Sequence, residues 1–144
     1  MNPSDKSSKQ LNELVAQLSR ILEKKSQVMF AYLHGSALTT ENPRDIDIAV
    51  YLFNEIFNQY KLNAAISLDF AIPLEMELEK NLQKPVDLQV LNQAPLAFRH
   101  RVIKQGRLMV DKNSDLRCDF EYLSRVQYFD FKPRIEEYLR EVVA

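Results

Sequence analysis

The sequence predicts one α/β domain of the α+β type, with a mixed sheet of about four strands and helices flanking it. Three observations support this prediction. The chain has 144 residues, of which 46% are hydrophobic and 27% charged, as is typical of a single globular domain with a sizeable core. Four short runs have the apolar composition or the alternation of strands. Around them, apolar residues recur every three or four positions, as on one face of a helix.

Four segments are expected to form the strands. Residues 28–33 are β-branched and aromatic and too few for a helix, so they predict a buried strand that ends at His34-Gly35-Ser36. Residues 45–52 alternate between two faces, with Asp45 and Asp47 on one of them, which predicts a second strand. Residues 86–91 and 107–110 are expected to form the third and fourth strands.

The remaining segments are expected to be helical, and all of residues 1–144 to form one domain. The first helix should cover residues 7–25 after a flexible tail at residues 1–10. A second helical stretch at 54–83 should be kinked or split at Pro73, because proline lacks an N–H donor. A third helix at 94–105 should stop at a left-handed Gly106. Ser114 should cap a last helical region, which Pro133 should divide in two.

Composition narrows the function classes. Nineteen basic and twenty acidic residues give a net charge of −1, whereas a protein that wraps nucleic-acid backbone is normally basic, so no direct nucleic-acid binding is expected. The longest apolar run has six residues, too few to span a membrane. The amino-terminal residues lack the apolar stretch of a secretion signal, and the single cysteine, Cys118, fits a reducing compartment. We therefore expect a cytoplasmic protein without a membrane partner.

The chain has only two glycines, and one of them stands beside a group of acidic residues that suggests chemistry. Gly35-Ser36 follows the first strand, where a turn of small residues offers backbone N–H groups and a hydroxyl to a phosphate. Asp45 and Asp47 are one residue apart on the second strand, so both carboxylates point the same way. Asp87 on the third strand would complete an all-oxygen site suited to magnesium.

At these residues the sequence resembles the nucleotidyltransferase superfamily that includes DNA polymerase beta, through its Gly-Ser…Asp-x-Asp signature. The segments that carry the resemblance are YLHGSALTTENPRDIDIAVYL, LEMELEKNLQKPVDLQVLNQAPLAFRHRVIKQGRLM and YFDFKPRIEEYLREV, which lie within residues 28–142. The likeness is greatest to the minimal nucleotidyltransferases, and among them to the MntA antitoxins of type VII toxin–antitoxin pairs. The partners of those antitoxins are HEPN-domain ribonucleases.

The resemblance implies a metal-dependent protein adenylyltransferase, an antitoxin that transfers AMP from ATP to a tyrosine of its toxin. Asp45, Asp47 and Asp87 would be the catalytic residues and would hold two Mg²⁺ ions. Gly35 and Ser36 would bind the nucleotide phosphates. The loop from Ala37 to Arg44 has eight residues and no glycine, where the family usually has about ten residues with a basic one early in the loop. Arg44 would partly replace that missing cation.

Two alternatives remain open at this point. The shortened loop is compatible with an antitoxin of weak or no catalytic activity that acts by binding alone. The same metal chemistry also serves nucleotidyltransferases that modify a small molecule or an RNA end. A basic run at Arg99, Arg101, Lys104 and Arg107 is expected to be a solvated face, with an acidic partner or ATP phosphates as alternative ligands.

Other residues beside these motifs are expected to have structural roles. His34, next to the Gly-Ser turn, is expected to pack at the strand end rather than to act in catalysis. Six of the fourteen phenylalanines and tyrosines fall between Phe120 and Tyr138. Some of them should pack on the sheet, and the excess predicts a partner surface near the carboxyl terminus.

Overall fold

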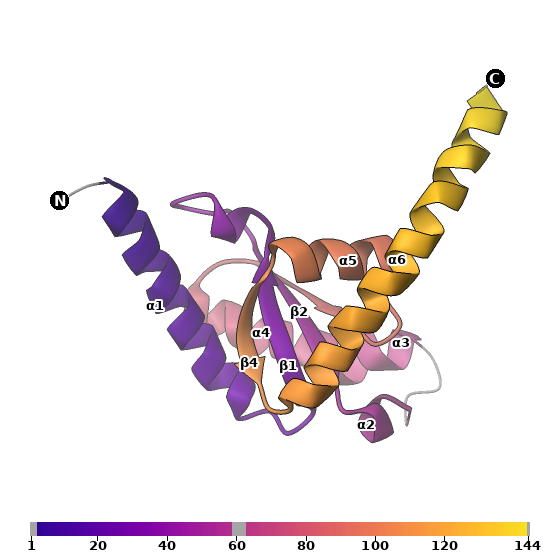
Figure 1. Ribbon diagram of the computed structural model, residues 1–144. Coiled ribbons are helices and arrows are strands. Elements are labelled where there is room, and N and C mark those ends of the chain that lie inside the picture. The colour runs from indigo at the N-terminus through magenta and orange to yellow at the C-terminus, as the bar shows by residue number, and fades with distance from the viewer. Residues whose placement is uncertain (1–2, 59–62, 144) are drawn as a thin grey trace.

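Four strands form one mixed sheet at the centre of the computed structural model, which describes residues 3–58 and 63–143 (Figure 1). The strand order is β3-β2-β1-β4. β1 pairs antiparallel with both β2 and β4, and β2 pairs parallel with β3. The strands are β1 (Val28–His34), β2 (Ile46–Leu52), β3 (Val86–Val90) and β4 (Arg107–Asp111). The predicted fold class is therefore confirmed, with each strand within one residue of its expected bounds.

Helices precede, connect and follow the strands. They are α1 (Pro3–Glu23), α2 (Asn54–Asn58), α3 (Asn63–Ile66), α4 (Ile72–Leu82), α5 (Leu96–Gln105) and α6 (Ser114–Val143), with a 3₁₀ turn η1 (Gly35–Leu38) and a π-helical turn η2 (Ser67–Ala71). α1 starts four residues before the expected Ser7, so residues 3–10 of the predicted tail belong to this helix, and residues 1–2 lie outside the described part. Within that part, no helix combines the length and the apolarity that a membrane span requires.

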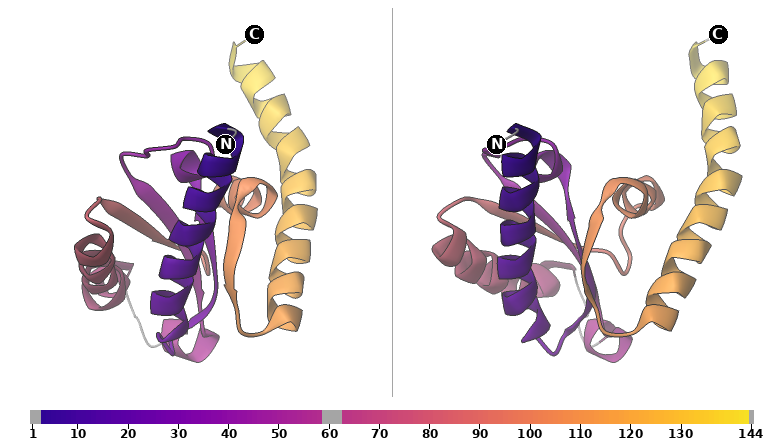
Figure 2. Two further views of the ribbon diagram at one scale, coloured as in Figure 1. Left: turned by 90° about the vertical axis from the view of Figure 1, so that its left-hand side faces the viewer. Right: turned by 60° about the vertical axis from the view of Figure 1, so that its left-hand side comes forward.

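The helices cover the two faces of the sheet in two layers (Figure 2). α1 and α4 pack on one face, where Leu18, Leu22, Leu74 and Leu78 meet the apolar residues of β1 and β2. α5 and α6 lie on the other face, over a smaller cluster that contains Phe30, Tyr32, Ala49, Tyr51, Leu91 and Val102. Alternate residues of one strand therefore face different helix layers, as the strand period of two requires.

The expected helical stretch at 54–83 is divided, as Pro73 predicted. α4 starts at Ile72 with Pro73 in its first turn, a position at which proline is common. The π-helical turn η2 precedes it directly. The expected stretch includes residues 59–62, which lie outside the described residues.

The predicted division of the last helix at Pro133 is wrong. α6 is one helix from Ser114 to Val143 and contains Pro133. Its first half packs against α5 and the sheet, and its second half extends away from the domain (Figures 1 and 2). Residues 129–142 are all exposed. Pro133 has no N–H to donate to the Phe129 carbonyl, but water can donate to this carbonyl instead. The proline therefore destabilises the helix less than it would in a buried segment.

Two predicted helix ends also differ from the structure. Gly106 is extended, with φ −73° and ψ 159°, and is not left-handed. Its lack of a side chain serves packing instead, because a Cβ atom there would overlap the Val102 carbonyl oxygen. At the start of α6 the capping side chain is Asn113, whose Oδ1 accepts a hydrogen bond from the Leu116 N–H at 3.1 Å. Ser114 instead donates to Asp111 at 2.9 Å.

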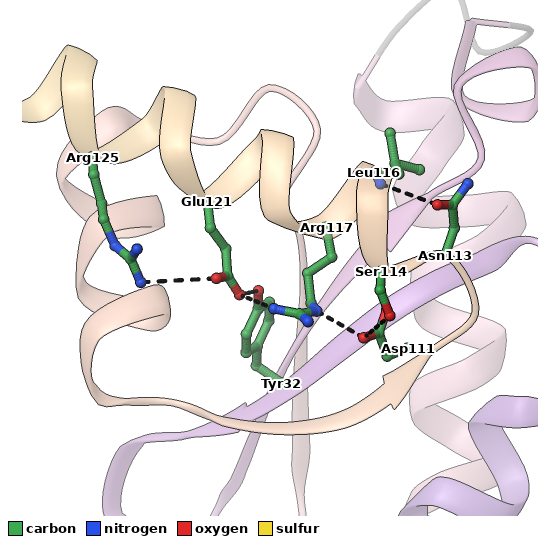
Figure 3. A network of polar contacts seen from close by, with 8 residues as sticks. All are labelled: Tyr32, Asp111, Asn113, Ser114, Leu116, Arg117, Glu121 and Arg125. Atoms are coloured by element: carbon green, nitrogen blue, oxygen red, sulfur yellow. Dashed lines mark hydrogen bonds and ion pairs between the residues drawn. The ribbon is translucent and has the colours of Figure 1, made fainter.

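A polar network fixes the first half of α6 to the sheet (Figure 3). Arg117 donates to Asp111 of β4 at 2.8 Å and to Glu121 at 3.1 Å. Tyr32 of β1 donates to the same Glu121 at 2.6 Å. Both Arg117 and Glu121 are about four-fifths buried, so these charge-assisted hydrogen bonds are well shielded from solvent. The network thereby sets the direction in which α6 leaves the domain.

Candidate active site

Three side chains form a row across one end of the sheet. His34 of β1 pairs with Asp47 of β2, and Asp47 pairs with Asp87 of β3. Residues directly opposite each other on neighbouring strands project from the same face. Asp47 shares its face with Ala49 and Tyr51, so the row lies on the side of the sheet that α5 covers. The expected meeting of the Asp47 and Asp87 strands is therefore present in the fold.

This row lines part of a cavity of about 830 Å³. Gly35, Asp47 and Asp87 line it from the sheet, and α5 contributes Phe98, Arg101 and Gln105. The cavity also extends around the edge strand β3, where Leu88 and Val90 belong to its wall. Its size and its mixture of apolar walls and convergent polar groups are those of a small-molecule site.

Three of the predicted site residues lie outside the cavity lining. Ser36 and Arg44 are exposed and do not line it. Asp45 precedes β2 and is exposed, but its charge acts on Asp47, whose pKa it raises. The structure thus brings Gly35, Asp47 and Asp87 together and leaves the other three at the periphery.

Gly35 makes room for the Asp47 carboxylate. Its φ is +75°, a conformation that side chains other than glycine rarely adopt. A Cβ atom at this position would overlap Oδ2 of Asp47. The scarce glycine is therefore required twice, once by the backbone turn that ends β1 and once by the close approach of the acidic side chain.

The surroundings of Asp47 disfavour its charged form. Burial raises the pKa of Asp47 above its ordinary value, His34 lowers it, and the charges of Asp87 and Asp45 raise it again. Burial also lowers the pKa of His34, which favours its neutral form. Carboxylates that disfavour one another in this way are relieved by a bound cation.

Among the described residues, no three His, Cys, Asp or Glu side chains are arranged to hold a metal ion by themselves. In sites for phosphate chemistry, Mg²⁺ is commonly held by one or two carboxylates, and substrate phosphates complete the shell. Asp47 and Asp87, in matched register beside a cavity that opens at Gly35, provide that donor set. The residues present therefore fit magnesium together with a phosphate-bearing substrate.

The row lies within a segment that a known family shares. Residues 16–115 match the family model described as polymerase beta, nucleotidyltransferase. The chain belongs to this nucleotidyltransferase family. No curated protein matches its sequence at a significant level.

Solved structures share the fold of this nucleotidyltransferase. One is a Shewanella oneidensis complex of a tri-AMPylated HEPN toxin with an MNT antitoxin, which matches with a TM-score of 0.68 and 20% identity over 93% of this chain and 99% of that chain. A second, a toxin–antitoxin complex with AMP-PNP, matches with a TM-score of 0.67 and 22% identity over 90% and 98% of the two chains. A third, a complex of MntA with HepT, matches with a TM-score of 0.65 and 20% identity over 90% and 97%.

Sequence reasoning missed several residues that hold the nucleotidyltransferase site together. Gln89 donates to Asp87 Oδ1 at 2.9 Å, and its position two residues along the strand was the available signal. Glu75 and Glu79 of α4 accept the backbone N–H groups of Leu88 and Val86 at 2.9 and 3.0 Å. These bonds satisfy the free edge of β3, which carries Asp87, and no local pattern indicates them because they join separate elements.

His34 packs at the strand end, as expected. Its ring lies edge-on to Phe98 of α5, with centroids 5.5 Å apart. The buried Nε2 atom of His34 has no hydrogen-bond partner among the described residues. The contact with Phe98 joins β1 to α5 beside the cavity that both residues line.

Proposed function

We propose that this nucleotidyltransferase is an antitoxin that transfers AMP from ATP to a tyrosine of a HEPN-domain toxin. The observation that carries the proposal is the matched register of Asp47 and Asp87 beside Gly35, over a cavity large enough for a nucleotide. The similar solved structures support it, because one contains an AMPylated toxin and another contains AMP-PNP. ATP is accordingly the proposed substrate and a HEPN toxin the proposed partner.

In this proposal Asp45, Asp47 and Asp87 are the catalytic residues and would hold Mg²⁺, two ions in total. When bound, magnesium offsets the charge of the triphosphate and lowers the pKa of the attacking hydroxyl. Gly35 leaves the approach to Asp47 free of a side chain. Ser36 and Arg44 are proposed to contact the nucleotide from outside the cavity, the serine through its hydroxyl and the arginine through its charge.

Two features favour a protein acceptor. The net charge of −1 gives no general attraction for RNA. In addition, the second half of α6 exposes Phe129, Phe131 and Tyr138, with 65%, 42% and 62% of each residue accessible. Aromatic side chains on a surface of this kind are typical anchors of protein interfaces. A docked partner can present a tyrosine hydroxyl to the nucleotide at a fixed distance, as an in-line transfer requires.

The test is the intact mass of a HEPN toxin incubated with this chain, ATP and Mg²⁺. Transfer predicts discrete increases of one adenylyl group each, which are absent with EDTA or with Asp47→Asn. A stable complex whose toxin keeps its original mass would favour the binding-only alternative. A toxin that neither binds nor gains mass would refute the proposal and favour a small-molecule or RNA acceptor.

A further inference from the structure

The positive charge that the structure places in the cavity lining comes from α5. Among the lining residues within 3–58 and 63–143, the part that the structure describes, Arg101 is the single lysine or arginine. Its charge lowers the pKa of both His34 and Asp47, so it acts on the acidic row itself. Arg44, the cation expected from the loop, is exposed and does not line the cavity.

The helical period explains why this member of the basic run reaches the cavity. Val102 is fully buried and packs α5 against the sheet. Phe98, Arg101 and Gln105 lie three or four residues apart on the same side of α5, and all three line the cavity. Lys104 is exposed and is not part of the lining.

The other two arginines of the run are engaged elsewhere. The Arg99 guanidinium lies 5.9 Å from the centre of the Phe120 ring, under α6. Arg107 donates to Asn12 of α1 at 2.8 Å. Arg101, in contrast, forms no ion pair within the described part of the chain, and the Phe98 ring supports its guanidinium at 5.5 Å. Arg101 is exposed, as Arg44 and Lys104 are, but it differs from them in lining the cavity, and its N–H donors are accessible to a ligand there.

We propose that Arg101 binds the phosphates of the nucleotide. A guanidinium presents paired N–H donors in the geometry that two phosphate oxygens accept. Arg101 lines the same cavity as Asp47 and Asp87, so a nucleotide bound there could contact both the arginine and a metal held by the carboxylates. Arg101 would thus supply a cation from within the cavity, in addition to the contact proposed for Arg44 from outside it. The assignment rests on the proposed function, because it presumes that the cavity holds a nucleotide.

Direct binding measurements test the assignment without relying on catalysis. Titration calorimetry with AMP-PNP and Mg²⁺ should show that Arg101→Gln weakens binding on the order of 10- to 100-fold, the loss of a charged hydrogen-bonding group. Adenosine has no phosphates, so its affinity should be unchanged. Arg101→Lys should recover part of the loss, because it keeps the charge and removes the planar fork. Lys104→Gln, on the same helix outside the cavity, should bind AMP-PNP like the wild type.

The outcomes separate this assignment from the proposed function. AMP-PNP affinity within twofold of wild type in Arg101→Gln would overturn the assignment and leave the function standing. Equal losses for AMP-PNP and adenosine would also overturn it, since they would indicate a general disturbance of the cavity. If the wild-type chain binds no AMP-PNP, both the function and the assignment fail. Thermal unfolding of each variant verifies that the compared proteins are folded.

Discussion

A Cβ atom on Gly35 would overlap the carboxylate of Asp47, so the turn after β1 and the acidic residue of β2 are fitted to each other. We predict that Gly35→Ala lowers the free energy of unfolding by about 1–2 kcal/mol, because alanine is strained at a positive φ. Nucleotidyl transfer should be lost as well, because Asp47 has to move. Urea unfolding and transfer assays measure the two effects.

Gly106→Ala is the matched control for Gly35→Ala. Its Cβ would overlap the Val102 carbonyl oxygen, so stability should also fall. The carboxylates of the row are not displaced, so the folded protein should keep its transfer activity. Full activity in folded Gly35→Ala would show that the fit between Gly35 and Asp47 has no bearing on catalysis.

The carboxylates themselves should be needed for transfer but not for folding. Asp47→Asn and Asp87→Asn should each reduce adenylyl transfer below detection. Stability should be unchanged or slightly higher, because burial disfavours the charged form of Asp47. Asp119→Asn, an exposed residue of α6, should behave like the wild type in both assays. Transfer by a double variant with both Asp45→Asn and Asp47→Asn would refute the assignment.

The projecting half of α6 should bind the toxin. Truncation after Asp130 removes an exposed segment that includes Phe131, Ile135 and Tyr138, and should weaken toxin binding on the order of 10- to 100-fold. The thermal unfolding midpoint should change little, because residues 131–142 are all exposed. Surface plasmon resonance with immobilised toxin measures the affinity. A folded truncated protein that binds and modifies the toxin at the wild-type rate would place the interface elsewhere.

Tyr32 should make the stability of the protein fall at high pH. Burial, together with Glu121, raises its pKa well above the ordinary 10.0. Below about pH 10 the phenol is protonated in both the folded and the unfolded protein, so it does not make the free energy of unfolding depend on pH. Above that pH the unfolded chain loses the proton first, so the free energy of unfolding decreases as pH rises. Urea unfolding at pH 8 to 11 should show a steeper decline in wild type than in Tyr32→Phe, and equal slopes would contradict this account.

Local sequence patterns sufficed to predict the strands and the division at Pro73. Residues 28–33 and 45–52 have strand composition or alternation, and these signals depend on neighbours along the chain. Pro73 starts α4 because a proline is compatible with a first helical turn. Pro133 follows the same local rule and yet lies inside α6. The difference is that Arg117 and Glu121 anchor the first half of α6, and its second half extends into solvent. The residues next to Pro133 in the sequence indicate neither of these features.

The Gly-Ser…Asp-x-Asp resemblance predicted the nucleotidyltransferase fold, and strand alternation predicted the face on which Asp47 and Asp87 lie. Which basic residue shares their cavity depends on how the elements pack, and no local pattern indicates it. Arg101 reaches the cavity, while Arg99 and Arg107 contact α6 and α1. The local sequence does not distinguish the four basic residues of this short run from one another. Their roles diverge because the rotation of α5 on the sheet, set by buried Val102, directs each side chain to a different neighbour.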